Sequence, residues 1–225
     1  MNHSFFNKSK KEQNKILMVI GSVSIALLLV FIVISLKTEV YIIGVFMFFA
    51  VLTIIAPFYD MPSLKKSGRV IYHSPLFISE KPTNRAIKIH GGTLFDYYFV
   101  IDKKMNGKQR TNFILQQYLD GLLSLMEQYK ENKHLIVKGT SYIINERTAE
   151  KMGFKTIKTD TFQKIILNFN FLNVLLSYSI AKNKLSFPAV NNTKTFQAEI
   201  GELIERKEYV ENLNQSLKRM IASNY

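Results

Sequence analysis

ILMVIGSVSIALLLVFIVISL (residues 16–36) and VYIIGVFMFFAVLTIIAPF (residues 40–58) are two apolar runs without a charged side chain, separated by Lys37-Thr38-Glu39. They are 21 and 19 residues long, and a bilayer core of roughly 30 Å needs about 20 apolar helical residues to cross it. Backbone groups in lipid must be hydrogen-bonded within the chain, so each run is predicted to be a helix. The sequence therefore predicts an antiparallel transmembrane hairpin; the alternative is a hairpin buried in a globular core.

The charge distribution predicts how this hairpin is oriented. The chain has a formal net charge of +13, which favours anionic partners such as lipid headgroups, nucleic acid or phosphorylated metabolites. Cations flank both ends of the hairpin: Lys8, Lys10, Lys11, Lys15, Lys65, Lys66 and Arg69. The positive-inside rule then places both termini in the cytoplasm. We expect a multi-pass protein of the cell (inner) membrane, with membrane lipids as its simplest partners. A cleaved signal peptide is the competing interpretation of the first run, but that run is longer than a usual signal sequence.

Composition excludes several kinds of site. The chain contains no cysteine, which rules out disulfides, thiolate metal sites and a cysteine nucleophile. His73, His90 and His134 share no metal-ligand spacing, so no metal site is predicted. The sequence contains no Walker loop, zinc signature or dinucleotide fingerprint. Basic charge alone predicts no specific nucleic-acid partner.

The chain divides into four parts along its length. Residues 1–15 form a polar basic leader, which we expect to be disordered. The hairpin occupies 16–58, with Pro57 and Pro62 expected to end its second helix. Residues 59–69 are expected to be a basic linker. Residues 70–225 are long enough for one cytoplasmic α/β domain of mixed α+β type.

Periodicity and turn residues predict the elements of this domain. Strands are expected over 70–72, 76–79, 86–90, 93–101, 135–137, 141–144 and 154–158. Helices are expected from a cap at Thr111 to about Glu131, over 146–152 between Asn145 and Gly153, and over 195–222. Helical spacing favours a helix over 162–181, either buried or interfacial. Gly121, inside the long helix, indicates close packing there.

A basic segment offers the clearest candidate for anion binding. Residues 103–110 carry four cations immediately before the expected start of the long helix: Lys103, Lys104, Lys108 and Arg110. A helix N-terminus presents free N–H groups and the positive end of its dipole, which suits a phosphate or pyrophosphate. The candidate cofactor-binding residues are Lys108, Gln109, Arg110 and Thr111. The alternative is a solvated basic turn.

The stretch NERTAEKMGF (residues 145–154) is similar to the "N…A…lGF" stretch of the GCN5-related acyltransferases. The predicted order of strand, cationic loop, long helix, strand, short helix and strand over 93–158 resembles the core of that family. In the family, the loop before the long helix holds the acyl-CoA pyrophosphate through a pattern like Q/R-x-x-G-x-G/A. The matching residues here are 109–114, where both glycines are missing. The resemblance implies that Gln109, Arg110 and Thr111 face the pyrophosphate and that Tyr142 lies near the acyl group.

These observations support more than one function. No complete catalytic motif is present, so the leading hypothesis is a non-catalytic membrane protein without a cofactor. Its basic domain would bind anionic headgroups or a membrane or cytoplasmic protein partner. The alternative is a membrane-tethered acyltransferase-like enzyme that uses acyl-CoA. A splayed pair of strands after Ile101, able to admit a pantetheine arm, would favour the enzyme, and continuous pairing there would count against it. A third hypothesis makes the domain the cytoplasmic plug of a larger membrane complex.

Overall fold

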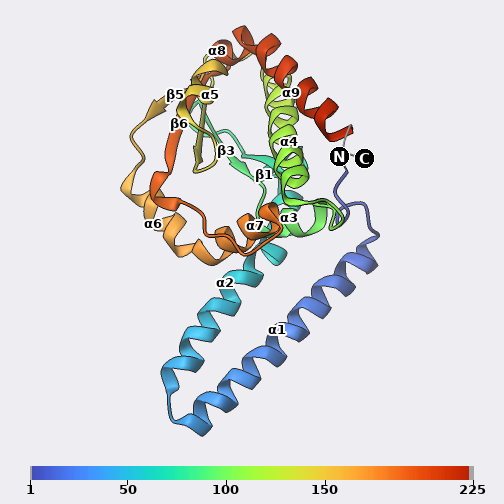
Figure 1. Ribbon diagram of the computed structural model, residues 1–225, viewed down its shortest axis with the longest axis vertical. Helices are drawn as coiled ribbons and strands as arrows, with labels where there is room; N and C mark the ends of the chain where they lie inside the picture. Colours follow the sequence, from blue (N-terminus) through green and yellow to red (C-terminus); the bar gives the residue numbers. More distant parts are fainter. Residues whose placement is uncertain (1, 223–225) are drawn as a thin grey trace.

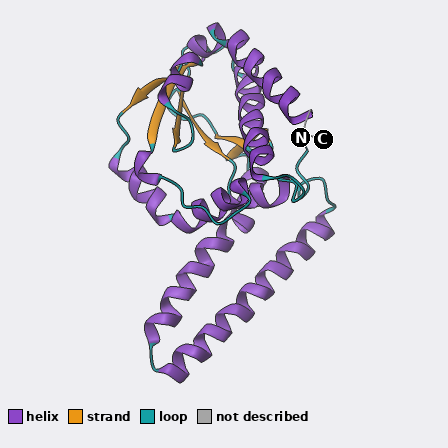
Figure 2. Ribbon diagram, viewed as in Figure 1, coloured by secondary structure: helices purple, strands orange, loops and turns teal. Residues whose placement is uncertain are grey.

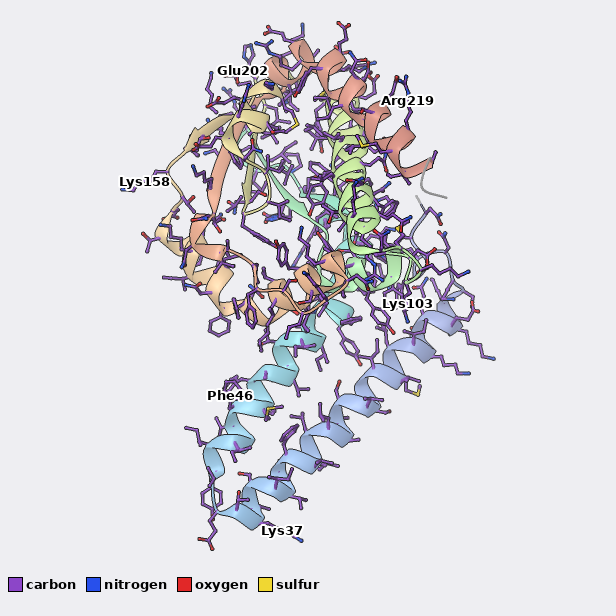
Figure 3. The ribbon with its side chains drawn as sticks, in the orientation of Figure 1. Lys37, Phe46, Lys103, Lys158, Glu202 and Arg219 are labelled. Carbon is purple, nitrogen blue, oxygen red and sulfur yellow. The ribbon has the colours of Figure 1, made fainter. Side chains whose placement is uncertain are left out.

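A computed structural model describes residues 2–222 as a long helical hairpin followed by a mixed α/β domain (Figure 1). The hairpin consists of α1 (Lys10–Thr38) and α2 (Tyr41–Lys66). By length and composition both helices are able to cross a membrane, and most of their apolar side chains are exposed. Lys37 lies at the tip of the hairpin, far from the domain (Figure 3). The predicted pair of apolar helices is confirmed.

The second helix does not end at its prolines, and the predicted linker over 59–69 is wrong over most of its length. α2 continues through Pro57 and Pro62 to Lys66. Pro57 has no N–H to donate to the carbonyl of Thr53. The side-chain Nδ2 of Asn173 donates to that carbonyl instead, at 2.8 Å. The helix continues past Pro57 into the domain, where Phe58 and Met61 are buried.

The expectation of a disordered leader is also wrong. His3 and Phe5 are completely buried in the domain, and the ring of Phe5 lies 5.0 Å from that of Phe95. Ser9 then caps α1 in a reciprocal capping box with Glu12. Apolar burial of this kind offsets the entropy of ordering a short polar segment.

A six-stranded sheet forms the centre of the domain (Figure 2). Its strands are β1 (Val70–Ser74), β2 (Phe77–Glu80), β3 (Ala86–Gly91), β4 (Ile136–Ser141), β5 (Lys155–Ile157) and β6 (Lys194–Glu199). The spatial order is β1-β2-β3-β4-β6-β5. β3 and β4 are parallel, whereas every other neighbouring pair is antiparallel. Strands were expected near β1 to β5 but not at β6, because residues 195–199 were expected to be helical. The strand expected over 141–144 is wrong, because β4 ends at Ser141.

The strand expected over 93–101 is instead a helix, α3 (Leu94–Val100). Thr93 and Asp96 form a capping box that starts it, and the Asp96 side chain is completely buried. Aromatic residues favour strands on average, but packing overrides such preferences. Here Phe95 and Tyr97 are buried on the helix against separate hydrophobic clusters.

The long helix α4 (Gly107–Gln128) starts before Thr111 because Asn106 caps it, accepting hydrogen bonds from the backbone N–H groups of Lys108 and Gln109. α4 lies across one face of the sheet, and its Leu122 and Leu125 share a core with Ile87 of β3. Gly121 packs directly on Phe77, so the predicted close approach is confirmed.

The remaining helices surround the sheet. They are α5 (Glu146–Lys151), α6 (Thr161–Phe169), α7 (Phe171–Lys182), η1 (Val190–Asn192), α8 (Ile200–Glu205) and α9 (Lys207–Ala222). α9 runs along α4, and α7 lies at the base of the domain against α2, with α6 next to α7 (Figure 1). The predicted helix over 162–181 is thus two helices, with a bend of 70° between them.

Candidate functional site: a cavity where two parallel strands part

The central strands β3 and β4 pair over only part of their length. Their parallel pairing begins at Ala86 and Ile136 and reaches Ile89 and Gly139. Beyond that point, β3 continues beside β2 to Gly91, and β4 continues beside β6 to Ser141. The two strands therefore diverge in the middle of the sheet.

A cavity of about 750 Å³ lies where they diverge. This volume lies within the range of small-molecule sites, roughly 300–1,000 Å³. Its wall combines the two strand ends with side chains from α4, α5, α6, α7 and the end of α2, and most of these are apolar. The residues beside the parted strands are Gly91, Gly92, Thr93, Gly139, Thr140, Ser141, Tyr142, Ile143 and Ile144.

Two glycines leave room for other side chains at this point of the sheet. A Cβ atom on Gly139 would lie 2.7 Å from Cγ1 of Ile89, and one on Gly91 would overlap the hydroxyl of Tyr118. Larger residues at either position would displace the neighbours that line the cavity. The absence of a side chain at Gly139 and Gly91 thus lets Ile89 and Tyr118 pack against the strands beside the cavity.

Three tyrosines contribute hydroxyl groups to the lining of the cavity. The hydroxyls of Tyr97 of α3 and Tyr118 of α4 lie 3.0 Å apart, and Tyr142, directly after β4, also lines the cavity. Burial, the largest cause in each case, raises the pKa of all three. They remain protonated at neutral pH, so they serve as hydrogen-bonding groups and not as bases.

The charged part of the lining lies at the ends of β1 and β2. It consists of Arg69, Glu80, Lys81 and His90. The backbone N–H of Lys81 donates to the carbonyl of Arg69 at 3.0 Å, which makes these two residues neighbours in the fold. His90 lies 2.9 Å from Glu80, and this hydrogen bond lowers the pKa of the Glu80 carboxyl. An amphipathic ligand would meet charge here and apolar surface elsewhere.

The wall formed by α7 contains an unusual amide. Asn173 is nine-tenths buried and lines the cavity. Its Nδ2 is used by the Thr53 carbonyl, whereas its Oδ1 has no hydrogen-bond partner among the described residues. A buried acceptor without a partner is unfavourable. A ligand hydroxyl or N–H in the cavity would satisfy it.

The residues predicted to bind a pyrophosphate lie in the first turns of α4, outside this cavity's lining. Arg110 is only 7% exposed, and its guanidinium donates to the carbonyls of Met105, Ile180 and Lys103 at 2.8–3.0 Å. Thr111 donates to the Gly107 carbonyl, and the Gln109 side chain accepts from the Asn106 N–H.

The start of α4 is also covered by another helix. Gly107 packs on the backbone carbonyl of Lys182, at the end of α7. The positive end of the α4 dipole therefore faces a carbonyl of the chain itself. Of the four predicted residues, Lys108 alone has an exposed side chain. As placed, these residues do not fit a pyrophosphate.

Other predicted features are placed as follows. Asn145 caps α5 and Gly153 follows it with φ of +97°, so the local structure expected for 145–153 is confirmed. Within residues 2–222, no three His, Asp or Glu side chains are grouped as metal ligands would be. The cavity was not predicted from the sequence.

Comparisons with models of known protein families, with curated proteins and with solved structures gave no match.

Proposed function

We propose that this is an integral membrane protein whose domain binds an apolar or amphipathic ligand between the diverging ends of β3 and β4. In this proposal α1 and α2 cross the cell membrane, both termini are cytoplasmic, and the domain lies at the inner face. The flanking cations support that orientation. The observation that carries the binding function is the apolar cavity of about 750 Å³.

The lining combines hydrogen-bonding and charged groups with apolar surface. The tyrosines of the apolar part stay protonated, and burial leaves their hydroxyls suited to hydrogen bonding. Arg69 and Lys81 outweigh the Glu80 carboxylate at one end of the cavity, and the resulting positive charge suits a carboxylate or phosphate headgroup. The proposed ligand is a molecule with an acyl chain and an anionic headgroup, and membrane lipids are its nearest source.

Native mass spectrometry of the full-length protein tests this proposal. The protein, purified in mild detergent, is incubated with palmitate, and the ligand retained after detergent removal is measured. We expect one retained ligand in the wild type and loss of it in Val174→Trp, which places an indole at the cavity wall. Leu172→Trp is the matched control, because the same helix carries it outside the lining. Equal retention by both variants would contradict the proposal.

A second candidate function is an acyltransferase-like activity that uses acyl-CoA. The parted parallel pair β3 and β4 supports it, because the resemblance to GCN5-related acyltransferases implies such a gap, although β3 precedes Ile101. The expected strand over 93–101, with which the resemblance begins, is instead helix α3. The cavity lies at the gap between β3 and β4. However, Arg110, which was expected to hold the pyrophosphate, donates its hydrogen bonds to three backbone carbonyls instead. We therefore assign no catalytic step to this chain.

Calorimetry with acetyl-CoA separates the two candidates, with ATP as the control for attraction by charge alone. Saturable acetyl-CoA binding that ATP does not match, and that Val174→Trp abolishes, would favour the enzyme. Palmitate binding without acetyl-CoA binding would favour the simple binding protein. Arg110→Ala is unsuitable as a probe here, because Arg110 holds three backbone carbonyls in the folded protein.

A further inference from the structure

α6 presents a large apolar face that nothing in the described chain covers. Phe162, Ile165, Ile166 and Phe169 follow one another at the spacing of a single helix face. All four are exposed, and Phe169 reaches 79%. The opposite side of the same helix faces the domain, where Leu167 lines the cavity and Gln163 accepts a hydrogen bond from Thr140. The helix is therefore fixed to the domain with its apolar face outward.

The segment after α7 carries two more exposed apolar residues. Leu185 and Phe187 are 72% and 70% exposed. Lys164, Lys182 and Lys184 lie beside these apolar residues in sequence. Contiguous exposed apolar residues flanked by cations are typical of segments that lie at a membrane surface.

The position of α7 relative to the hairpin indicates how deep α6 lies along the second candidate span. Asn173 contacts Thr53, which lies within the apolar run that ends at Phe58. The start of α7 thus lies level with the last turns of the second candidate span, and α6 adjoins it through the bend at Asn170 (Figure 1). At nine residues, α6 is roughly 13 Å long and too short to cross a bilayer.

We propose that the apolar face of α6, together with Leu185 and Phe187, inserts shallowly into the leaflet from which α2 emerges. This inference rests on the proposed membrane insertion of α1 and α2. The three lysines would then lie among anionic headgroups. Because α6 and α7 also form part of the cavity wall, the insertion places that wall against lipid and gives a membrane ligand a short path inside.

Tryptophan fluorescence tests this placement, because the chain contains no Trp of its own. Each of three variants of the full-length chain carries one Trp at an exposed position: Phe169→Trp on α6, Phe46→Trp on α2 and Tyr209→Trp on α9. Each is reconstituted into phosphatidylcholine vesicles brominated either near the headgroup or near the end of the acyl chain. Bromine quenches only indoles that approach it.

We expect bromine near the headgroup to quench Phe169→Trp more strongly than bromine near the chain end, and neither lipid to quench Tyr209→Trp. Phe46→Trp, whose side chain points away from α1 (Figure 3), should be quenched by bromine near the chain end. Quenching of Phe46→Trp without quenching of Phe169→Trp would overturn the placement of α6 alone. Absence of quenching in both would overturn the proposed membrane insertion as well.

Discussion

Asn173 donates a hydrogen bond from Nδ2 to the carbonyl of Thr53 at 2.8 Å, and Thr53 is the residue whose helical donor is missing because Pro57 has no N–H. The bond joins the cavity wall to the second hairpin helix. It also supplies the hydrogen bond that α2 would otherwise lack at this carbonyl. One side chain therefore stabilises the helix and fixes the domain against it.

Asn173→Ala is expected to lower the free energy of unfolding by about 1–3 kcal/mol, because the Thr53 carbonyl then has no donor. Circular dichroism melting of the detergent-solubilised protein measures the change. In a Pro57→Ala background, the restored backbone N–H replaces the lost donor, so the same substitution should have a smaller effect. Equal effects in both backgrounds would show that Asn173 does not compensate for the proline.

Phe5→Ala is expected to destabilise the domain by about 3–5 kcal/mol, as for other buried phenylalanines. Phe5 is completely buried, and its ring lies 5.1 Å from that of Phe99. Thermal melting measures the loss, and limited proteolysis should cleave the leader of this variant sooner than that of the wild type. Asn7→Ala, at an exposed position in the same segment, is the control and should change neither result.

Gly121→Ala tests whether packing or helix propensity decides the stability of α4. Alanine gains about 1 kcal/mol in a helix over glycine. A Cβ atom at this position, however, would overlap the side chain of Phe77, and overpacking typically costs about 1–3 kcal/mol. We expect a lower melting temperature. Gly201→Ala in α8 meets only ordinary contacts at 3.4 Å and should be neutral or stabilising. A more stable Gly121→Ala protein would contradict the packing described.

His73 should make the stability depend on pH. Burial lowers its pKa from the ordinary 6.5 to about 4. As the pH falls, the His73 imidazole is therefore protonated in the unfolded chain before it is protonated in the folded protein. The stabilisation of the folded state that comes from neutral His73 is fully present above pH 6.5 and is lost as the pH falls towards 4. Melting temperatures over this window should fall less steeply in His73→Gln than in the wild type. A His134→Gln control, at an exposed site, should follow the wild type. Parallel curves for His73→Gln and the wild type would contradict this prediction.

The strength of the sequence pattern decided which parts of the fold were predictable. The hairpin followed from two long apolar runs, and α5 followed from Asn145 and Gly153, whose effects are local. Residues 93–101 were misassigned because their aromatic composition favours a strand, while the capping pair Thr93 and Asp96 and the packing of Phe95 decide in favour of a helix.

The candidate site depended on contacts that the sequence does not encode locally. The cavity exists because β3 and β4 stop pairing at Ile89 and Gly139. These two strands are far apart in the chain. Similarly, the burial of Arg110 depends on the carbonyl of Ile180 at the end of α7. The sequence shows a basic segment before a helix. It does not show that backbone carbonyls of the same chain already accept the hydrogen bonds of Arg110.

The most direct test of the central claim is to locate a bound acyl chain within the full-length protein. The protein is reconstituted in lipid nanodiscs with palmitate that carries a photoactivatable diazirine, irradiated, and digested for peptide mass spectrometry. We predict adducts on residues 139–144 and 170–177 at the cavity, in addition to adducts on the exposed faces of α1 and α2. Val174→Trp should remove the cavity adducts and leave the hairpin adducts unchanged. Adducts confined to the hairpin in the wild type would contradict the claim that the domain binds an acyl ligand.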